Sequence, residues 1–340
     1  MENPIEKVEK AIENVEEKVF EKVTPDNLPS FFDVLKSAYS FCLEHKKLLF
    51  LYFFIPLLVS AFVHVFGNLF FSIAFKSGSV VTIAVTALLV LVISLAVGVF
   101  NAIVTYGSSL FIKSLEDGKK HSLKNHYRDV LSFGLPIVLT SIVTVLMLIG
   151  GGVLFIIPGI ILMLASFFAL NAVVLENKKT KDALVRSFAL TRNKKLYLFV
   201  QSLGLAVVVA LASIVALLIS VILFSIFKPL LSIEIIKPVY LFVSTVFHQA
   251  VSAGLISFAM VFFYKLYKNL SHTVHHVTEG YVKKVTKIIY SFAIFGVVVI
   301  VGVILLSVIL KPRIESEFNR MQIEKQIEAQ IKNSLANPVK

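Results

Sequence analysis

The chain has 340 residues, of which 57% are hydrophobic and only 16% are charged, and this balance excludes an ordinary soluble globular protein. A helix that crosses a bilayer core needs about 20 apolar residues. Seven continuous apolar runs of that length lie near 48–74, 80–106, 134–155, 157–175, 197–227, 239–264 and 288–310. Spans of a β-barrel would instead alternate apolar and polar residues. We therefore predict an all-α integral membrane protein with about seven transmembrane helices.

Residues 1–29 precede the membrane domain and predict a cytosolic amphipathic helix followed by a linker. Aliphatic residues recur there at spacings of three and four: Ile5, Val8, Ile12, Val15 and Val19. Such a seam is typical of a short coiled coil. We expect residues 5–23 to pair with a second copy, with a partner protein or with the chain's own basic surface. Because no apolar signal sequence is apparent before the first run, we expect that run to remain as a signal anchor.

The next segment predicts a helix that lies at the membrane surface before the first span. Ser30 and Asp33 stand in the register of a capping box. Four residues share one predicted face: Phe32, Leu35, Tyr39 and Cys42. Cys42 is the only cysteine, which excludes an intramolecular disulfide and a Cys-based zinc site. A similar apolar stripe precedes the third span, at Leu123, Tyr127, Val130 and Leu131.

A strongly basic segment between the fourth and fifth spans predicts a third helix of this kind. Thr180 is the predicted N-cap, and Asp182 follows in the first turn, where the helix dipole favours an anion. We expect its apolar side to lie in the acyl boundary and its cations among lipid headgroups. The candidate headgroup contacts are Lys178, Lys179, Lys181, Arg186, Arg192, Lys194 and Lys195.

These three amphipathic segments, which we call elbow helices, predict an internal helix-hairpin repeat. Shifting the chain by 149 positions aligns five pairs without a gap: Asp33 with Asp182, Leu35 with Leu184, Tyr39 with Phe188, Lys46 with Lys195, and Phe50 with Phe199. We predict that residues 30–270 form a six-span domain built from three units of elbow, span and span. Repeats of this kind occur both in transporters and in scaffolds.

The distribution of cations predicts the orientation of the chain. Loops on the side of the N-terminus hold twenty-four Lys and Arg residues, whereas the opposite loops hold only Lys76, Lys228 and Lys237. By the positive-inside rule the N-terminus is cytoplasmic, and seven spans in the cell membrane then put the C-terminus outside. Because the cations rim one membrane face, the net charge of +12 indicates contact with anionic lipid rather than with nucleic acid.

Residues in and after the fourth span carry a resemblance to a known family. They are Pro158-Gly159, Leu175-Glu176, Ala183-Leu184, Arg186-Ser187 and Leu190-Thr191-Arg192, preceded by Gly118 and Ser122-Leu123. This pattern resembles the membrane domain that precedes some glycerophosphodiester phosphodiesterases and also occurs as stand-alone membrane proteins. The resemblance covers about 30–270, and the chain departs from the pattern at Ala165 and Asn171. It does not imply the enzyme, because catalysis in that family belongs to a separate barrel of about 250 residues.

Polar residues inside the predicted spans are few and include no Asp or Glu. The candidate intramembrane polar site consists of Asn101, Asn171, His248 and Gln249. A polar group at that depth is a functional candidate, and interhelical hydrogen bonding is the simpler explanation. Without a carboxylate partner for a proton relay, we expect His248 to be neutral and held against a neighbouring helix.

The C-terminal part predicts a basic loop and seventh span over 271–311 and an amphipathic tail over 312–340. His272, His275 and His276 are spaced for metal capture on a helix, although a solvated segment explains them as well. We expect no cofactor and no bound metal.

Two classes of function remain open. One is a non-enzymatic membrane scaffold or lipid-interacting protein. The alternative is a small-molecule or lipid transporter, which broken helices and buried charges would favour.

Overall fold

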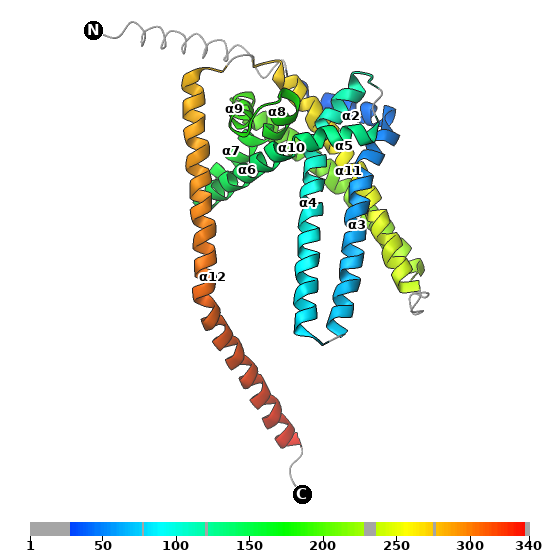
Figure 1. Ribbon diagram of the computed structural model, residues 1–340, viewed down its shortest axis with the longest axis vertical. Helices are drawn as coiled ribbons and strands as arrows, with labels where there is room; N and C mark the ends of the chain where they lie inside the picture. The colour runs from blue at the N-terminus through cyan, green and yellow to red at the C-terminus, as the bar shows by residue number, and fades with distance from the viewer. Residues whose placement is uncertain (1–27, 77, 120–121, 228–235, 275–276, 337–340) are drawn as a thin grey trace, which may run out of the picture. The chain divides into compact units, whose positions relative to one another are not determined.

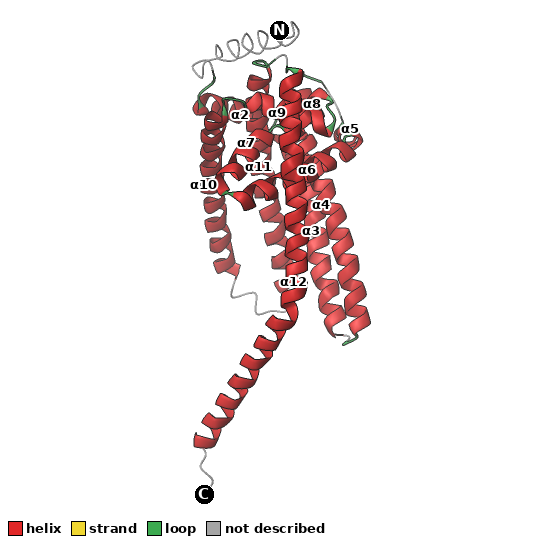
Figure 2. Ribbon diagram, turned by 90° about the vertical axis from the view of Figure 1, so that its left-hand side faces the viewer, coloured by secondary structure: helices red, strands yellow, loops and turns green. Residues whose placement is uncertain are grey.

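In the computed structural model, the described residues are 28–76, 78–119, 122–227, 236–274 and 277–336 (Figure 1). These residues are almost all helical and contain no strand (Figure 2). The coiled-coil helix predicted at residues 5–23 lies outside this part of the chain.

Three short helices correspond to the predicted elbows: α2 (Phe31–Glu44), α5 (Leu123–Ser132) and α9 (Thr180–Thr191). The longer elements are α3 (Lys46–Lys76), α4 (Val80–Glu116), α6 (Gly134–Leu154), α7 (Ile156–Ser166), α8 (Ala169–Glu176), α10 (Lys195–Phe227), α11 (Ile236–Ser271) and α12 (Glu279–Ala336). Counting α7 and α8 as one span, seven helices in the described part are long and apolar enough to cross a membrane. The described residues thus confirm the prediction of an all-helical chain with seven helices able to span a membrane.

The last span differs from the sequence prediction at both ends. The structure has one continuous helix, α12, in place of a basic loop, a span and a separate tail. Lys283, Lys284 and Lys287 lie on the first turns of this helix rather than in a loop. The helix also continues past Leu310, the last residue of the predicted span, and includes Pro312; residues 313–336 contain neither glycine nor proline to end it.

The described chain divides into two compact units. Unit 1 covers Met1–Val143 and Met163–Lys287, and unit 2 covers Thr144–Leu162 and Ile288–Lys340. Within unit 1, α11 is the central helix and packs against α2, α3, α4 and α10. Helices α3 and α4 form a hairpin and lie side by side in both views (Figures 1 and 2).

Aromatic side chains form the core of unit 1 where α3, α4 and α5 meet. The Tyr52 ring stacks on Phe111 and Tyr127, with centroid distances of 4.4 and 5.1 Å. Tyr52 donates a hydrogen bond to the carbonyl of Val104 at 3.1 Å, and Tyr127 donates one to the carbonyl of Tyr52 at 2.6 Å. Burial raises the pKa of Tyr127 to about 12, so its hydroxyl remains a donor at neutral pH.

The lengths of α4 and α10 away from this core expose apolar side chains. The most apolar 18-residue windows of both helices contain no buried residue. Exposed apolar stretches of this length are unfavourable in water, whereas lipid accommodates them. The packed core of unit 1 therefore lies toward the end that carries the elbow helices, which we call the elbow end.

Helices α2 and α9 begin 149 positions apart, at residues 31 and 180, and the following spans begin at residues 46 and 195, again 149 apart. Burial follows the same offset. The residues buried in both copies are Val34 and Ala183, Ala38 and Ser187, Phe41 and Leu190, and Leu49 and Leu198. The first and third predicted units therefore match in helix starts and burial, and the three-unit repeat stays a prediction.

The details of the elbow helices differ in part from the sequence prediction. Ser30 and Asp33 form the predicted capping box of α2. The hydrogen bond from Ser30 to the carboxylate lowers the pKa of Asp33. Of the predicted face of α2, Phe32 and Tyr39 are 75% and 57% exposed, whereas Leu35 and Cys42 are half-buried. The N-cap of α9 is Lys179 instead of Thr180, and it makes no side-chain capping bond.

In unit 2, two glycines allow close contact between α6 and α12. A Cβ atom on Gly150 would lie 2.2 Å from the carbonyl oxygen of Phe292, and one on Gly296 would lie 2.0 Å from that of Leu146. No side chain fits at either position. Small residues are the usual means of bringing helix backbones together in a membrane.

Candidate functional site

The fourth span is broken between α7 and α8, and a side chain from α9 closes the break. The Ser187 hydroxyl donates to the carbonyl of Ala165 at 2.7 Å and accepts from the backbone N–H of Phe168 at 3.0 Å. Ser187 is fully buried, so water does not serve these groups in its place. Thr191, one turn further along α9, donates to the carbonyl of Ser187 at 3.0 Å.

An ion pair between Glu176 and Arg186 joins the end of α8 to α9. The Arg186 Nε lies 3.0 Å from both Glu176 carboxylate oxygens, and the side chain is 13% exposed. Its Nη1 and Nη2 atoms donate to the carbonyls of Val274 and Ser271, at 2.6 and 3.4 Å. Tyr267 of α11 donates to Glu176 Oε1 at 2.5 Å. We call these residues the α8–α9–α11 clasp.

A second carboxylate, Glu116 at the end of α4, is bound entirely from α11. Tyr264 and Lys265 each donate to one of its oxygens at 2.7 Å, and Lys268 lies 2.9 Å from the carboxylate. Two neighbouring tyrosines of α11 therefore bind the two carboxylates: Tyr264 binds Glu116, and Tyr267, one turn further along, binds Glu176. A pocket of about 300 Å³ lies over the two carboxylates, lined also by Lys113 and His272.

Four of the seven predicted headgroup cations have partners inside the protein. Besides Arg186, the Arg192 guanidinium lies 5.3 Å from the centre of the Tyr281 ring, and Lys194 donates to the Thr273 hydroxyl at 2.5 Å. Burial lowers the pKa of Lys194. Lys178 lies 3.8 Å from Glu176.

The remaining three predicted cations, Lys179, Lys181 and Lys195, have no ion-pair partner in the described part of the chain. Lys179 and Lys181 are exposed, and Lys195 is half-buried. The apolar side of α9 does not lie in an acyl boundary, because seven of its twelve residues are buried within the protein. Of the predicted headgroup cations at this helix, only the exposed Lys179 and Lys181 are accessible to lipid headgroups.

The four intramembrane candidates do not form one site. Asn101 donates to Ser60 at 3.2 Å, and Asn171 accepts from Ser109 at 2.8 Å, so each joins two neighbouring segments. Gln249 is half-buried. Among the described residues, the structure shows no contact of His248 with a neighbouring helix: its side chain is exposed, and its ring contact is with Phe247 of the same helix.

The predicted histidine cluster lies partly outside the described residues, at His275 and His276. The described residues contain no group of three His, Cys, Asp or Glu side chains arranged to hold a metal.

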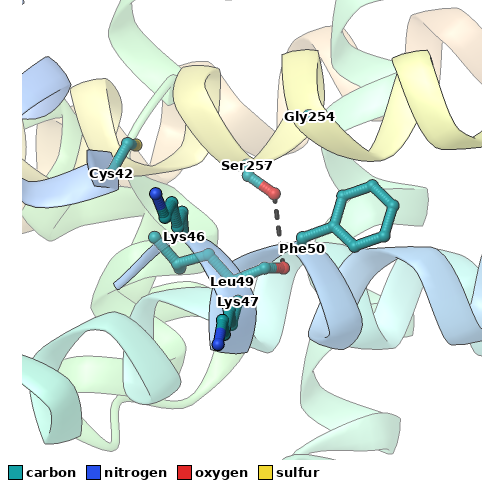
Figure 3. A pocket seen from close by; sticks show the side chains of 7 residues that line it. All are labelled: Cys42, Lys46, Lys47, Leu49, Phe50, Gly254 and Ser257. Atoms are coloured by element: carbon teal, nitrogen blue, oxygen red, sulfur yellow. Dashed lines mark hydrogen bonds between the residues drawn. The ribbon is translucent and has the colours of Figure 1, made fainter. Parts of the chain in front are cut away.

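A second pocket lies between the start of α3 and the middle of α11, and we call it the α3–α11 pocket (Figure 3). Its volume is about 400 Å³, and its lining residues are Cys42, Lys46, Lys47, Leu49, Phe50, Gly254 and Ser257. The Ser257 hydroxyl donates to the carbonyl of Ala253 in its own helix at 2.6 Å and also lies 3.4 Å from the carbonyl of Leu49 on α3 (Figure 3). The Lys46 ammonium lies beside Cys42, whereas Lys47 points to the other side of Leu49 (Figure 3).

Sequence reasoning missed Glu116 and Glu176 as partners of α11. The second span was expected to end near residue 106, but α4 continues to Glu116. The signal that could have found them is the motif Tyr264-Lys265-Leu266-Tyr267-Lys268 at the end of the sixth span. Two Tyr-Lys pairs three residues apart present hydroxyl and ammonium donors on one helix turn, which suits two carboxylates.

A family model described as a domain of unknown function (DUF7847) matches residues 130–270, which is less than half of the chain. The matched region contains Ser187, Glu176, Arg186 and Tyr267, whereas Glu116 lies outside it. No curated protein and no solved structure matches the chain.

Proposed function

We propose that the protein is a non-enzymatic multi-pass membrane scaffold that binds anionic lipid headgroups at its elbow end. One observation carries this proposal: the carboxylates of the span ends face inward, while many cations face outward. Within the described residues, the exposed cations without an ion-pair partner are Lys36, Lys46, Lys47, Lys113, Lys124, Arg128, Lys179, Lys181, Lys283, Lys284 and Lys287, together with Lys76 at the far end of α3. A surface of this kind attracts anionic lipid by about 1 kcal/mol per basic residue.

The polar clusters support a structural role rather than catalysis. Glu116 and Glu176 are each held by cations and a tyrosine hydroxyl, so neither is poised as a general base. The residues that resemble the phosphodiesterase membrane domain include Glu176, Arg186 and Ser187. If the chain is related to that membrane domain, the two share the residues that join α7, α8, α9 and α11. The relationship would not give this chain the activity of the separate barrel domain.

The transporter alternative has one feature in its favour, the broken span α7–α8. Transporters use the free backbone groups at such breaks to bind substrates and ions. Here the carbonyl of Ala165 and the N–H of Phe168 are both taken by Ser187. The break is therefore closed by the protein itself, which favours the scaffold.

The lipid-binding proposal predicts a charge effect at α9. Replacing Lys179 and Lys181 with Gln should weaken retention of phosphatidylglycerol by up to roughly thirtyfold, the equivalent of about 2 kcal/mol for two surface lysines. Native mass spectrometry of the detergent-solubilised protein measures the retained lipid. Lys76→Gln, at the exposed end of α3 remote from the elbows, is the control and should have no effect. Unchanged retention in the double variant would mean that these charges act only during insertion.

The cation asymmetry also predicts that the elbow end is cytoplasmic in the cell membrane. In a variant with Cys42 replaced by Ser, cysteines introduced at Lys76 and Lys181 should label differently in intact cells. A membrane-impermeant thiol reagent should modify the cysteine at position 76 from outside and reach position 181 only after permeabilisation, because Lys and Arg are retained on the cytoplasmic side. The reverse pattern would contradict the proposed orientation.

A further inference from the structure

The α3–α11 pocket has the layout of a site for one lipid rather than of a packing defect. Lys46 and Lys47 are exposed at its mouth, at the point where the polar sequence of the elbow gives way to the apolar sequence of the span. Leu49 and Phe50 lie about one turn deeper on α3. The pocket therefore changes from cationic to apolar over the depth at which a lipid changes from phosphate to acyl chain.

Gly254, which is itself exposed, leaves the α11 wall of the pocket open. Two other glycines of unit 1 are required by close contacts, since a Cβ on Gly107 would lie 2.0 Å from Val130 and one on Gly204 would lie 2.6 Å from Phe31, whereas Gly98 has open surroundings. A Cβ on Gly254 would meet no atom within 4 Å. Helix packing therefore does not explain a residue that weakens the interior of α11. The missing side chain does provide apolar space beside Ser257.

The charges around the mouth favour an anion. Neither Lys46 nor Lys47 has an ion-pair partner among the described residues. The neighbouring carboxylate, Glu44, is 74% exposed at the side chain and lies 3.9 Å from His45. Lys265, the next cation on α11, is bound to Glu116 and lies over the Phe41 ring, so it is not free to neutralise a ligand.

We propose that the α3–α11 pocket binds a single anionic glycerophospholipid, with its phosphate at Lys46 and one acyl chain along Leu49, Phe50 and Gly254. This inference rests on the proposed lipid-binding function and assigns it a specific site. Lys46 is the principal phosphate ligand because its ammonium lies on the Cys42 side of the pocket, whereas Lys47 points away (Figure 3). The apolar wall selects a lipid over a soluble phosphate, which would gain nothing from it.

Cys42 provides a reporter inside the pocket, since it is the only cysteine of the chain. The test measures its alkylation rate by N-ethylmaleimide in detergent, at one fixed pH because burial raises the pKa of the thiol to about 11. Phosphatidylglycerol should slow the reaction several-fold more than phosphatidylcholine with the same chains. Glycerol 3-phosphate and inorganic phosphate should not slow it. Equal rates with the two lipids, or protection by the soluble phosphates, would overturn the proposal.

Two variants locate the lipid. Lys46→Gln should raise the phosphatidylglycerol concentration for half-maximal protection by about fivefold, the equivalent of one surface lysine, and Lys76→Gln, at the far end of α3, should not. Gly254→Leu fills the space at the α11 wall and should abolish protection, whereas Gly98→Leu, at an exposed glycine of α4 with equally open surroundings, should preserve it. Full protection in both Lys46→Gln and Gly254→Leu would place the lipid elsewhere. Since Lys46 is exposed, that variant keeps the test valid if Gly254→Leu does not fold.

Lipid retention measured on the same samples separates this inference from the proposed function. If the protein retains phosphatidylglycerol in preference to phosphatidylcholine but Cys42 is not protected, the pocket assignment is wrong and the lipid-binding function stands. If the protein shows no such preference, both are wrong.

Discussion

Replacing Ser187 with Ala should lower the free energy of unfolding by about 1–3 kcal/mol, because it leaves the buried N–H of Phe168 without its acceptor and the carbonyl of Ala165 with only the 3.5 Å hydrogen bond from Thr191. The carbonyl of Ala165 and the N–H of Phe168 lie on opposite sides of the break in the fourth span, and Ser187 serves both. In a membrane no water is at hand to replace the hydroxyl, so each unpaired group carries a substantial cost.

Thermal unfolding in a mild detergent measures this effect, with Ser213→Ala as the control. Ser213 is an exposed serine of α10 that donates only to the carbonyl of Val209 in its own helix, so its loss should change stability by less than about 0.5 kcal/mol. Equal melting temperatures for the two variants would show that Ser187 does not hold the break closed.

The helices of the fold were predictable from sequence wherever a single local pattern determines where a helix lies or begins. Continuous apolar runs are long enough to identify all seven spans, and Ser30 with Asp33 identifies the start of α2. The ends of α4 and α12 were not predictable from hydropathy, because both helices continue into polar sequence. Charged residues such as Lys and Glu are good helix formers, so leaving the apolar layer does not end a helix.

The site was less predictable, because amphipathicity does not say which surface an apolar face meets. The sequence pattern predicted the apolar side of α9 in lipid, but tertiary packing buries Leu184 and Leu190 in the protein. Arg186 was expected among headgroups for the same reason. Its partners Glu176, Ser271 and Val274 come from two other segments, and only the tertiary arrangement brings them together. Lys179 and Lys181 lie outside the surface of α9 that packs against the protein, and they remain exposed as expected.

Replacing Arg186 with Met should lower the free energy of unfolding by about 3–5 kcal/mol, the usual cost of removing one partner from a largely buried ion pair. The change leaves the Glu176 carboxylate with Tyr267 and the distant Lys178, and it leaves the carbonyls of Ser271 and Val274 without their donor. The α8–α9–α11 clasp should therefore loosen as a unit.

Two further variants separate the ion pair from the bulk of the side chain. Arg186→Lys keeps the charge but cannot reproduce the fork that reaches Glu176, Ser271 and Val274 together, so it should recover only part of the stability. Combining Arg186→Met with Glu176→Gln should cost less than the sum of the two single changes, since the double variant no longer carries an uncompensated carboxylate. Thermal unfolding of the four proteins gives the coupling, with Lys181→Gln on the exposed edge of α9 as the control. If Arg186→Met is no less stable than Lys181→Gln, or if the two single changes are additive, Arg186 does not hold α9 to α8 and α11 through Glu176.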